Sequence, residues 1–448
     1  MSLDLPEAFS MRMQDALGVQ YDAFQQALAL PPPISIRLNK MRNIQIPKGG
    51  TSIPWEKDGY YLPSRPYFTH DPDFHSGSYY VQEASSMLIG NVLEQLDKSN
   101  WKLVIDLCAA PGGKTTHMLS KLKEDVLLIA NEVVATRLGS LKQNLIKWGY
   151  GNAVATMYSV ENLASSGVKS DLLLVDAPCS GEGMFRKDVD SIGHWSVKNL
   201  ITCEMRQNEI LSHVPSLNKV GGYLIYSTCT YNPNENIQQV NTLIEQGYYT
   251  SLGVTLDSDW GVEKIEKGKA IGYQCYPHKV RGEGLFFALL QRTDKEFREN
   301  RVSKFKLNEQ FKRLTKDMVS KLPTWLQHYH HRLLMDTDST IYLNPDPEGL
   351  YSSVIALKPL FTLGSVKGKE FIPDHALAML HTFKAEYPQV ELTEEQALLY
   401  LKKESNFELN VPTKGWYIVT FNGNALGFIK VLDQRINNYF PNNLRILK

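Results

Sequence analysis

Four apolar runs of strand length dominate the middle of the chain. An uninterrupted apolar run is typical of a strand that is buried on both faces, as in a parallel sheet. Between the runs, residues 137–148 and 199–214 repeat apolar positions at helical spacing. Strands that alternate with helices predict a doubly wound α/β domain. The four runs are residues 103–107, 126–130, 171–175 and 222–226.

The regions beside this core have different patterns. Before it, a predicted helix ends at Leu30 ahead of three prolines, and residues 34–38 form a short predicted strand. The stretch from there to Tyr80 is rich in Gly, Pro and aromatic residues, so we expect it to be irregular. Residues 273–277 and 285–290 predict an antiparallel hairpin at the end of the core.

The C-terminal region predicts a small β-rich domain. A helix is expected over residues 374–384, and strands at 415–419 and 425–429 flank the turn pair Asn422-Gly423. The chain therefore divides into four predicted parts. These are an N-terminal α+β appendage (1–75), the α/β core (76–292), an intermediate domain with a basic segment (293–372) and the β-rich domain (373–448).

Composition excludes several classes of protein. Of the 448 residues, 43% are hydrophobic and 21% charged, and no apolar run approaches the roughly 20 residues of a membrane span. The first residues lack the basic and apolar regions of a signal peptide, so we expect a cytoplasmic protein. Five cysteines without a C-x-x-C pair argue against a disulfide scaffold and a structural zinc site, and we expect no metal.

Charge is evenly balanced over the whole chain. Lys and Arg number 48, as do Asp and Glu, whereas a nucleic-acid partner usually leaves a basic footprint. The total alone therefore favours an enzyme of small molecules. The segment 295–317 is an exception, because it has eight basic and four acidic residues. It is either a solvated linker or a nucleic-acid patch.

A glycine-rich turn follows the first core strand and opens a helix. It reads Asp-Leu-Cys-Ala-Ala-Pro-Gly-Gly-Lys-Thr-Thr over residues 106–116, and its small residues allow a ligand to approach the backbone. A P-loop would need glycine in place of Cys108, and Pro111 removes a backbone N–H, so an NTPase is disfavoured. The dinucleotide fingerprint is absent. Glu132, which ends the second strand, is placed to bind the ribose of S-adenosylmethionine.

Two cysteines follow neighbouring strands, in Asp176-Ala-Pro-Cys179 and Ser227-Thr-Cys229-Thr. Because the carboxyl ends of parallel strands meet at one edge, we expect both thiols to face one cleft. Methyl transfer to C5 of a pyrimidine needs such a pair: one thiolate adds to C6, and a base then removes the C5 proton. Asp176 is placed to hydrogen-bond the cytosine amine and N3. The geometry leaves open which thiol has which role.

These motifs resemble those of the NOL1/NOP2/Sun family of RNA cytosine-5 methyltransferases. The resemblance implies a Rossmann-like S-adenosylmethionine-dependent core. The C-terminal residues 415–447 resemble the PUA-like RNA-binding domain of the bacterial branch that methylates the decoding region of 16S ribosomal RNA. The motifs that carry the resemblance are residues 79–86, 108–114, 176–187, 227–230 and 232–236.

The resemblance also implies roles for individual residues. Cys229 would be the nucleophile and Cys179 the base that permits release. Ser159 stands where the family usually has an aspartate near the adenine of the methyl donor. The donor would be held by Cys108, Ala109, Ala110, Pro111, Gly112, Gly113, Lys114, Glu132, Ser159 and Asp176. Candidates for contacts with RNA phosphates are Arg37, Arg186, Lys187, Lys430 and Arg435.

Together these observations predict an RNA cytosine-5 methyltransferase that acts on decoding-region 16S ribosomal RNA, with ribosomal RNA or the small ribosomal subunit as partner. We expect a monomer. The alternatives are the same chemistry on 23S ribosomal RNA or transfer RNA, a P-loop-like NTPase, and a non-catalytic RNA-binding module.

Overall fold

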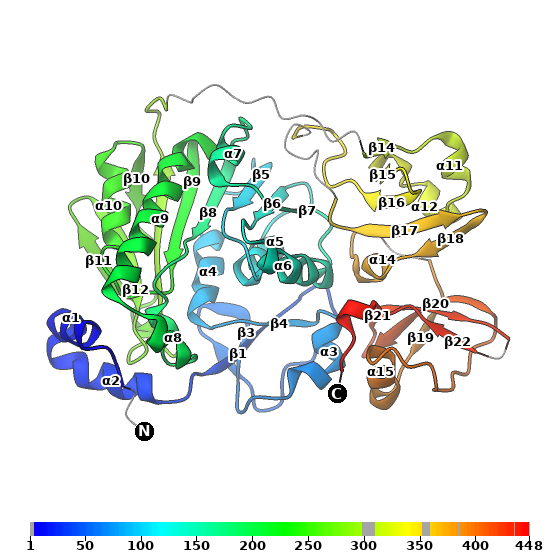
Figure 1. Cartoon of the computed structure of the whole chain (residues 1–448), viewed down its shortest axis with the longest axis horizontal. Helices are drawn as coiled ribbons and strands as arrows, with labels where there is room; N and C mark the ends of the chain where they lie inside the picture. Colours follow the sequence, from blue (N-terminus) through cyan, green and yellow to red (C-terminus); the bar gives the residue numbers. More distant parts are fainter. Residues whose placement is uncertain (1–3, 298–309, 352–358, 384–385, 434, 448) are drawn as a thin grey trace.

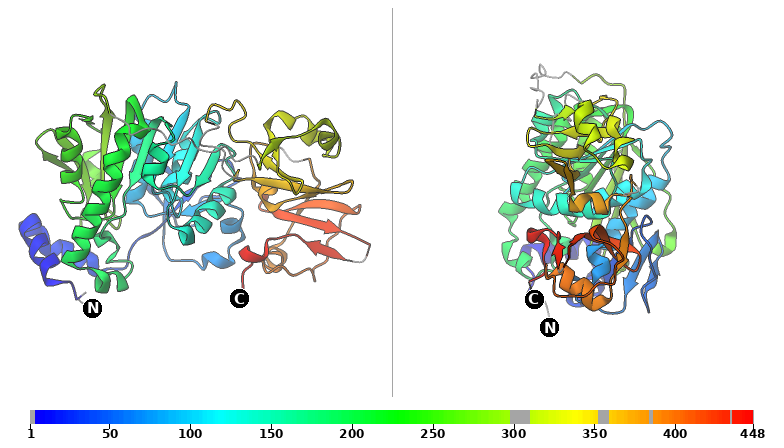
Figure 2. Two further views of the ribbon diagram at one scale, coloured as in Figure 1. Left: turned by 45° about the horizontal axis from the view of Figure 1, so that its top comes forward. Right: turned by 90° about the vertical axis from the view of Figure 1, so that its right-hand side faces the viewer.

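The strands of the described residues form four sheets that follow one another along the chain (Figure 1). This computed structural model describes residues 4–297, 310–351, 359–383, 386–433 and 435–447. The N-terminal helices lie at one end of the long axis, and the C-terminal sheet lies at the opposite end (Figure 2). Within the described ranges, no helix combines the length and apolarity needed to cross a bilayer.

The central sheet confirms the predicted doubly wound core. Its strand order is β11-β12-β13-β9-β8-β5-β6-β7, and β10 pairs with β13. Strands β5 to β9 are parallel, and β13 is antiparallel to β9. Their bounds are β5 Leu103–Asp106, β6 Leu127–Asn131, β7 Ala153–Thr156, β8 Ser170–Asp176, β9 Asn218–Thr228, β10 Tyr249–Leu252, β11 Glu263–Lys267, β12 Ala270–Cys275 and β13 Leu285–Arg292.

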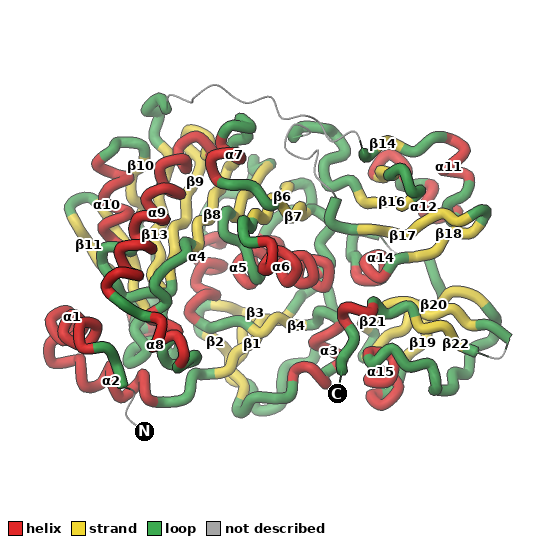
Figure 3. Tube along the Cα trace, in the orientation of Figure 1, coloured by secondary structure: helices red, strands yellow, loops and turns green. Residues whose placement is uncertain are grey.

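Helices cover both faces of this sheet (Figure 3). Successive strand residues point to opposite faces, so Val104 packs with α4, α5 and α6, whereas Ile105 packs with α7, α9 and α10. This double burial explains why the core strands are continuous apolar runs. The helices are α4 Leu88–Glu94, α5 Gly113–Lys121, α6 Ala135–Trp148, α7 Val160–Ala164, α8 Asp190–His194, α9 Val197–Leu217 and α10 Ile237–Glu245.

The described N-terminal part has two helices at its start, a short third helix and a four-stranded sheet of order β2-β3-β1-β4. Because β4 pairs with β1, we propose that this unit extends to Val81 and not only to residue 75. Phe9 and Phe24 of the helices pack against Phe185, Trp195, Tyr231 and Tyr276 of the core. The elements are α1 Glu7–Leu17, α2 Tyr21–Ala29, β1 Ile34–Leu38, β2 Thr51–Ile53, β3 Glu56–Leu62, α3 Pro72–His75 and β4 Tyr79–Val81.

The expectation of irregular structure between residue 38 and Tyr80 is wrong. The segment contains β2, β3 and α3, and a buried charge hides the β3 pattern. Glu56 of β3 is buried, lies 2.8 Å from Nε2 of His117 and pairs with Lys121. Burial alone would raise the pKa of Glu56, but these partners hold it far below its usual value. A tertiary ion pair thus places a carboxylate where the strand pattern requires an apolar residue.

Two smaller sheets complete the chain. Asn422 and Gly423 have positive φ and form the predicted turn between β20 and β21. The helix expected over 374–384 is shorter, since Leu380 is extended; Lys384 lies outside the described residues, as do residues 298–309 of the basic segment. The elements are β14 Lys312–Arg313, α11 Lys316–Ser320, α12 Thr324–Gln327, β15 Leu333–Met335, β16 Thr340–Leu343, β17 Thr362–Lys367, β18 Glu370–Pro373, α14 His375–Met379, β19 Gln389–Glu391, α15 Glu394–Leu401, β20 Gly415–Phe421, β21 Asn424–Val431 and β22 Ile436–Asn438.

Close backbone contacts join these parts to the core. Gly149 ends α6 with a φ of 85°, and a Cβ on it would lie 2.3 Å from the carbonyl oxygen of Met379. Arg42 Nη2 donates to that same oxygen at 2.9 Å. Asn43 exchanges hydrogen bonds with Asn424, which ties the N-terminal part to the C-terminal hairpin. The C-terminal part therefore packs against both the end of α6 and the N-terminal part.

Candidate active site

A cavity of about 230 Å³ opens at the carboxyl ends of β5, β8 and β9. The strand order reverses between β5 and β8, which is where ligands bind in doubly wound sheets. The cavity brings together many of the residues proposed from the sequence. Its lining includes Tyr80, Gln82, Glu83, Asp106, Cys108, Ala109, Ala110, Pro111, Gly113, Lys114, Asp176, Met184, Lys187, Cys229 and Glu283.

A lysine and an aspartate pair across this cavity. Lys114 Nζ lies 2.6 Å from Oδ1 of Asp176, and the Ser227 hydroxyl donates to the same oxygen at 2.8 Å. Burial alone would lower the pKa of Lys114, but the Asp176 carboxylate outweighs it and raises this pKa. The ammonium is therefore charged at neutral pH. It holds the aspartate in one orientation at the end of β8.

The two cysteine sulfurs are in contact. The Sγ atoms of Cys179 and Cys229 are 3.2 Å apart, and the Cys229 backbone N–H donates to Cys179 Sγ at 3.3 Å. The neighbouring Cys229 and burial together raise the pKa of Cys179 well above its usual value. Of the two, Cys229 lines the cavity and Cys179 does not. This asymmetry distinguishes two thiols that the sequence geometry leaves equivalent.

A buried carboxylate, Glu235, ties the two cysteine loops together. It accepts hydrogen bonds from the backbone N–H (2.8 Å) and hydroxyl (2.6 Å) of Ser180, next to Cys179. It also accepts from the amides of Asn232 at 3.0 Å and Gln207 at 3.1 Å. Four donors thus converge on one side chain that is fully buried. Its motif contributes to the family resemblance, but sequence reasoning assigned it no role.

A second buried carboxylate, Glu182, connects the site to the N-terminal helices. It lies 2.5 Å from Nη2 of Arg12, accepts from the Trp195 indole at 2.9 Å and accepts from the Tyr231 backbone at 3.1 Å. The loop after β8 is therefore fixed from two sides.

Asp106 at the end of β5 was also missed by sequence reasoning. It is 1% exposed, its Oδ2 accepts from the Thr115 hydroxyl at 2.6 Å, and its Oδ1 has no partner among the described residues. Burial raises the pKa of Asp106 to about 7. A polar residue that ends an apolar strand, as in Leu103–Asp106, is the signal that could have found it.

Three of the residues expected at the methyl donor do not line the cavity. Glu132 accepts the backbone N–H of Val134 at 2.8 Å and lies 3.2 Å from Arg137. Ser159 is exposed and caps α7 by accepting the backbone N–H of Asn162. Gly112 supplies the turn before α5, with a φ of 110°.

Two of the RNA candidates are engaged by the protein itself. The expectation that Arg37 contacts RNA is wrong, because this side chain is 1% exposed and donates to Gln82 and Thr116 at 2.7 Å each. Arg186 is partly exposed, and it donates to the carbonyl oxygens of Leu30, Pro31 and Gly282. It therefore anchors the segment after α2 to the site.

The other three RNA candidates reach the surface. Lys187 lines the cavity and lies 3.4 Å from Glu283. Lys430 pairs with Glu370 beside the ring of Trp416, and Arg435 is exposed. Among the described side chains, no group of three or more His, Cys, Asp or Glu could hold a metal ion.

Replacing Glu235 with alanine should both destabilise the protein and lower its activity. It leaves four buried donors without an acceptor, at roughly 1–3 kcal/mol for each unpaired group. We expect urea denaturation to show a loss of at least about 3 kcal/mol. The control is Glu209→Ala, an exposed position of α9. Equal stability of the two variants would contradict this role.

Stability should depend on pH through Asp106. Its pKa is about 7 when folded and has an ordinary value of 3.8, so the folded chain holds a proton that the unfolded chain has lost. Stability therefore falls as pH rises from 4 to 7. We expect the advantage of Asp106→Asn over wild type to grow by about 1.4 kcal/mol per pH unit over this range and then level off. Chemical denaturation at several pH values measures it, and a constant difference would refute it.

Comparisons with known proteins cover nearly the whole chain. Residues 93–291 match the family described as 16S rRNA methyltransferase RsmB/F, residues 5–84 match the N-terminal domain of 16S rRNA methyltransferase RsmF, and residues 387–446 match the methyltransferase RsmF PUA domain. Among solved structures, a methyltransferase homologue from Pyrococcus horikoshii has a TM-score of 0.55 and 26% identity over 64% of this chain and 96% of its own. NSun6 from the same organism with SFG has the same TM-score at 19% identity, over 66% of this chain and 100% of its own, and shows the fold alone.

Two curated relatives bear the name ribosomal RNA small subunit methyltransferase F. The protein from Shewanella oneidensis is 30% identical over 94% of this chain and 93% of its own length. The protein from Klebsiella pneumoniae is 28% identical over 98% and 96%, respectively. The chain belongs to the RsmB/F family of 16S rRNA methyltransferases.

Proposed function

We propose that this protein methylates C5 of a cytosine in the decoding region of 16S ribosomal RNA, with S-adenosylmethionine as the donor. The observation that carries the proposal is the contact of two sulfurs, of which one lines a cavity that also holds the Lys114–Asp176 pair. The names of the full-length relatives support the ribosomal RNA substrate.

The residues around the turn fit the methyl donor. The N-terminus of α5 offers backbone N–H groups, and Asp106 Oδ1 is a buried acceptor without a partner that suits an ammonium group. When bound, the donor supplies a methyl group on a positively charged sulfur. Residues 108–111, residues 113–114 and Asp106, all in the cavity lining, would hold it beside Cys229. Glu132 and Ser159 are outside the cavity lining, and we therefore assign the donor contacts to this smaller set.

Cys229 is placed to act as the nucleophile. Its thiolate adds to C6 of the cytosine, which leaves the electron pair of the C5–C6 double bond at C5. This pair bonds to the methyl carbon as the bond between that carbon and the donor sulfur breaks and its electrons stay on the sulfur. Asp176, held by Lys114, accepts a hydrogen bond from the cytosine amine. The C5 proton then leaves to a base, the double bond re-forms, and Cys229 is expelled as a thiolate.

Cys179 is placed to be that base. The contact between the two sulfurs determines at which step the Cys179 thiol can lose its proton. In the free enzyme the neighbouring Cys229 sulfur raises the pKa of Cys179, so this thiol keeps its proton. Bonding of the Cys229 sulfur to C6 removes this effect of the neighbour. The Cys179 thiol can then release its proton to solvent and accept the proton from C5.

Purified protein should transfer label from tritiated S-adenosylmethionine to small ribosomal subunits from a strain that lacks this gene. Bisulfite sequencing should then find one or more newly protected cytosines in the decoding region. Cys229→Ser is the control and should transfer none. Transfer only to 23S ribosomal RNA or transfer RNA, or binding of ATP with Mg²⁺ in place of the donor, would refute the proposed substrate or chemistry.

Replacing Cys179 with alanine should trap the enzyme on its product. Without this base, methylated RNA should accumulate as a covalent adduct that survives a denaturing gel, and turnover should fall by at least about 100-fold. Cys229→Ser should give neither adduct nor product. Cys203→Ser is the matched control, since Cys203 is buried in α9 away from the cavity lining. An adduct in the Cys229 variant instead would reverse the two roles.

A further inference from the structure

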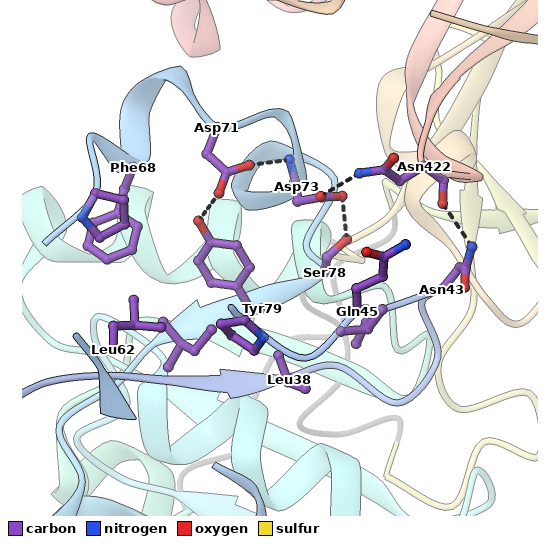
Figure 4. A pocket seen from close by; sticks show the side chains of 14 residues that line it. Leu38, Asn43, Gln45, Leu62, Phe68, Asp71, Asp73, Ser78, Tyr79 and Asn422 are labelled. Atoms are coloured by element: carbon purple, nitrogen blue, oxygen red, sulfur yellow. Dashed lines mark hydrogen bonds between the residues drawn. The ribbon is translucent and has the colours of Figure 1, made fainter. Parts of the chain in front are cut away.

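A second cavity, of about 310 Å³, lies where the N-terminal and C-terminal parts meet (Figure 4). Its walls come from the N-terminal sheet, from residues 43–47 after β1, from residues 66–73 before and within α3, and from the turn between β20 and β21. We propose that it binds one unpaired base of the RNA substrate, of the kind that carries an exocyclic amino group. This inference rests on the proposed function, because it concerns the same RNA.

The floor of the cavity suits a flat aromatic ring. Apolar side chains from the outer face of the sheet and the ring of Phe68 form it, and the Tyr79 ring stands beside them (Figure 4). Bases stack on such rings whatever their sequence. The apolar lining is Ile36, Leu38, Leu62, Phe68 and Tyr79.

The polar wall selects hydrogen-bond donors. Asp71 accepts from the Tyr79 hydroxyl at 2.6 Å, and Asp73 accepts from the Asn422 amide at 2.8 Å. These bonds fix both carboxylates, and each carboxylate oxygen has a further lone pair to offer. The fourteen described residues that line the cavity include no Lys or Arg. A phosphate would meet two carboxylates within the lining, and the Arg65 guanidinium lies 5.5 Å from the centre of the Phe68 ring at its edge, whereas an amino group would meet acceptors.

The position of the cavity fits an RNA that also enters the active site. Tyr79 and Tyr80 are consecutive residues of β4, and they line the second cavity and the catalytic cavity, respectively. The two cavities therefore lie on opposite faces of the N-terminal sheet. β4 therefore contributes to the walls of both cavities, so an RNA bound in one lies near the other.

The two parts of the chain that build this cavity are those outside the catalytic core. Their matches are to the N-terminal domain and the PUA domain of RsmF, and Asn43 and Asn424 lock them together through mutual hydrogen bonds. The cavity is therefore already formed before RNA binds, so RNA binding does not lose free energy by ordering these segments.

The test places a bulky side chain at the edge of the cavity so that it occupies the space proposed for the base. Gln45 is exposed and lines the cavity, whereas the adjacent Ile46 is exposed and does not, so Gln45→Trp and Ile46→Trp are a matched pair. Gln45→Trp should weaken binding of a fluorescent 16S ribosomal RNA fragment by about tenfold and raise its KM similarly. The kcat and the KM for S-adenosylmethionine should stay unchanged, as should all values for Ile46→Trp.

Ultraviolet cross-linking of the wild-type complex should join Phe68 or Tyr79 to an adenosine, guanosine or cytidine outside the methylated position. Equal RNA affinities for the two tryptophan variants would overturn the inference, as would a cross-link only to uridine. Binding of a free nucleoside monophosphate that both variants retain would also overturn it. A different outcome would separate the two proposals. If Gln45→Trp weakened RNA binding but the wild-type protein methylated no RNA, the result would refute the proposed function and support the base site.

Discussion

The active site depends on one buried carboxylate that holds two separate loops in contact. Cys179 and Cys229 lie 50 positions apart, and they follow different strands. The parallel pairing of β8 with β9 brings their loops to one edge of the sheet, but pairing alone does not set a sulfur–sulfur distance. Glu235 does so, because it accepts from the backbone beside one cysteine and from the loop that follows the other. The relative position of the two thiols therefore rests on the hydrogen bonds of a side chain that lies outside the cavity lining.

Buried charge also explains how a chain with no net charge can serve an RNA substrate. Several of its ionic groups hold the parts of the protein together, as Arg37 holds the N-terminal sheet to α5 and Glu182 holds the first helix to the catalytic loop. Such groups contribute to the total without facing solvent. The formal count is therefore a poor guide to the charge that a nucleic acid meets.

The parts of the structure that could be predicted are those that simple periodicity or short motifs encode. The buried parallel strands, the Asn422-Gly423 hairpin and the clustering of the glycine-rich turn with Asp176 and Cys229 follow from apolar runs and from the geometry of strand ends. Strand β3 could not be predicted from the sequence, because the partner of Glu56 lies in α5, far along the chain.

The same reason explains the errors at the site. Asp106, Glu182 and Glu235 owe their importance to partners that only the fold supplies, and Arg37 is buried by contacts that no local pattern reports. A sequence shows which residues can do chemistry. It does not show which charged side chains are buried in the folded protein.

The packing of the first two helices has a consequence for synthesis. Phe9 and Phe24 bury their rings against Phe185, Tyr231 and Tyr276, so during synthesis these two helices must wait for about 250 more residues. At roughly 5–20 residues per second, the apolar faces of α1 and α2 stay uncovered for about 12–50 s. Contacts of such long sequence separation form late. The two N-terminal helices thus remain without their apolar partners for much of the time in which the chain is made.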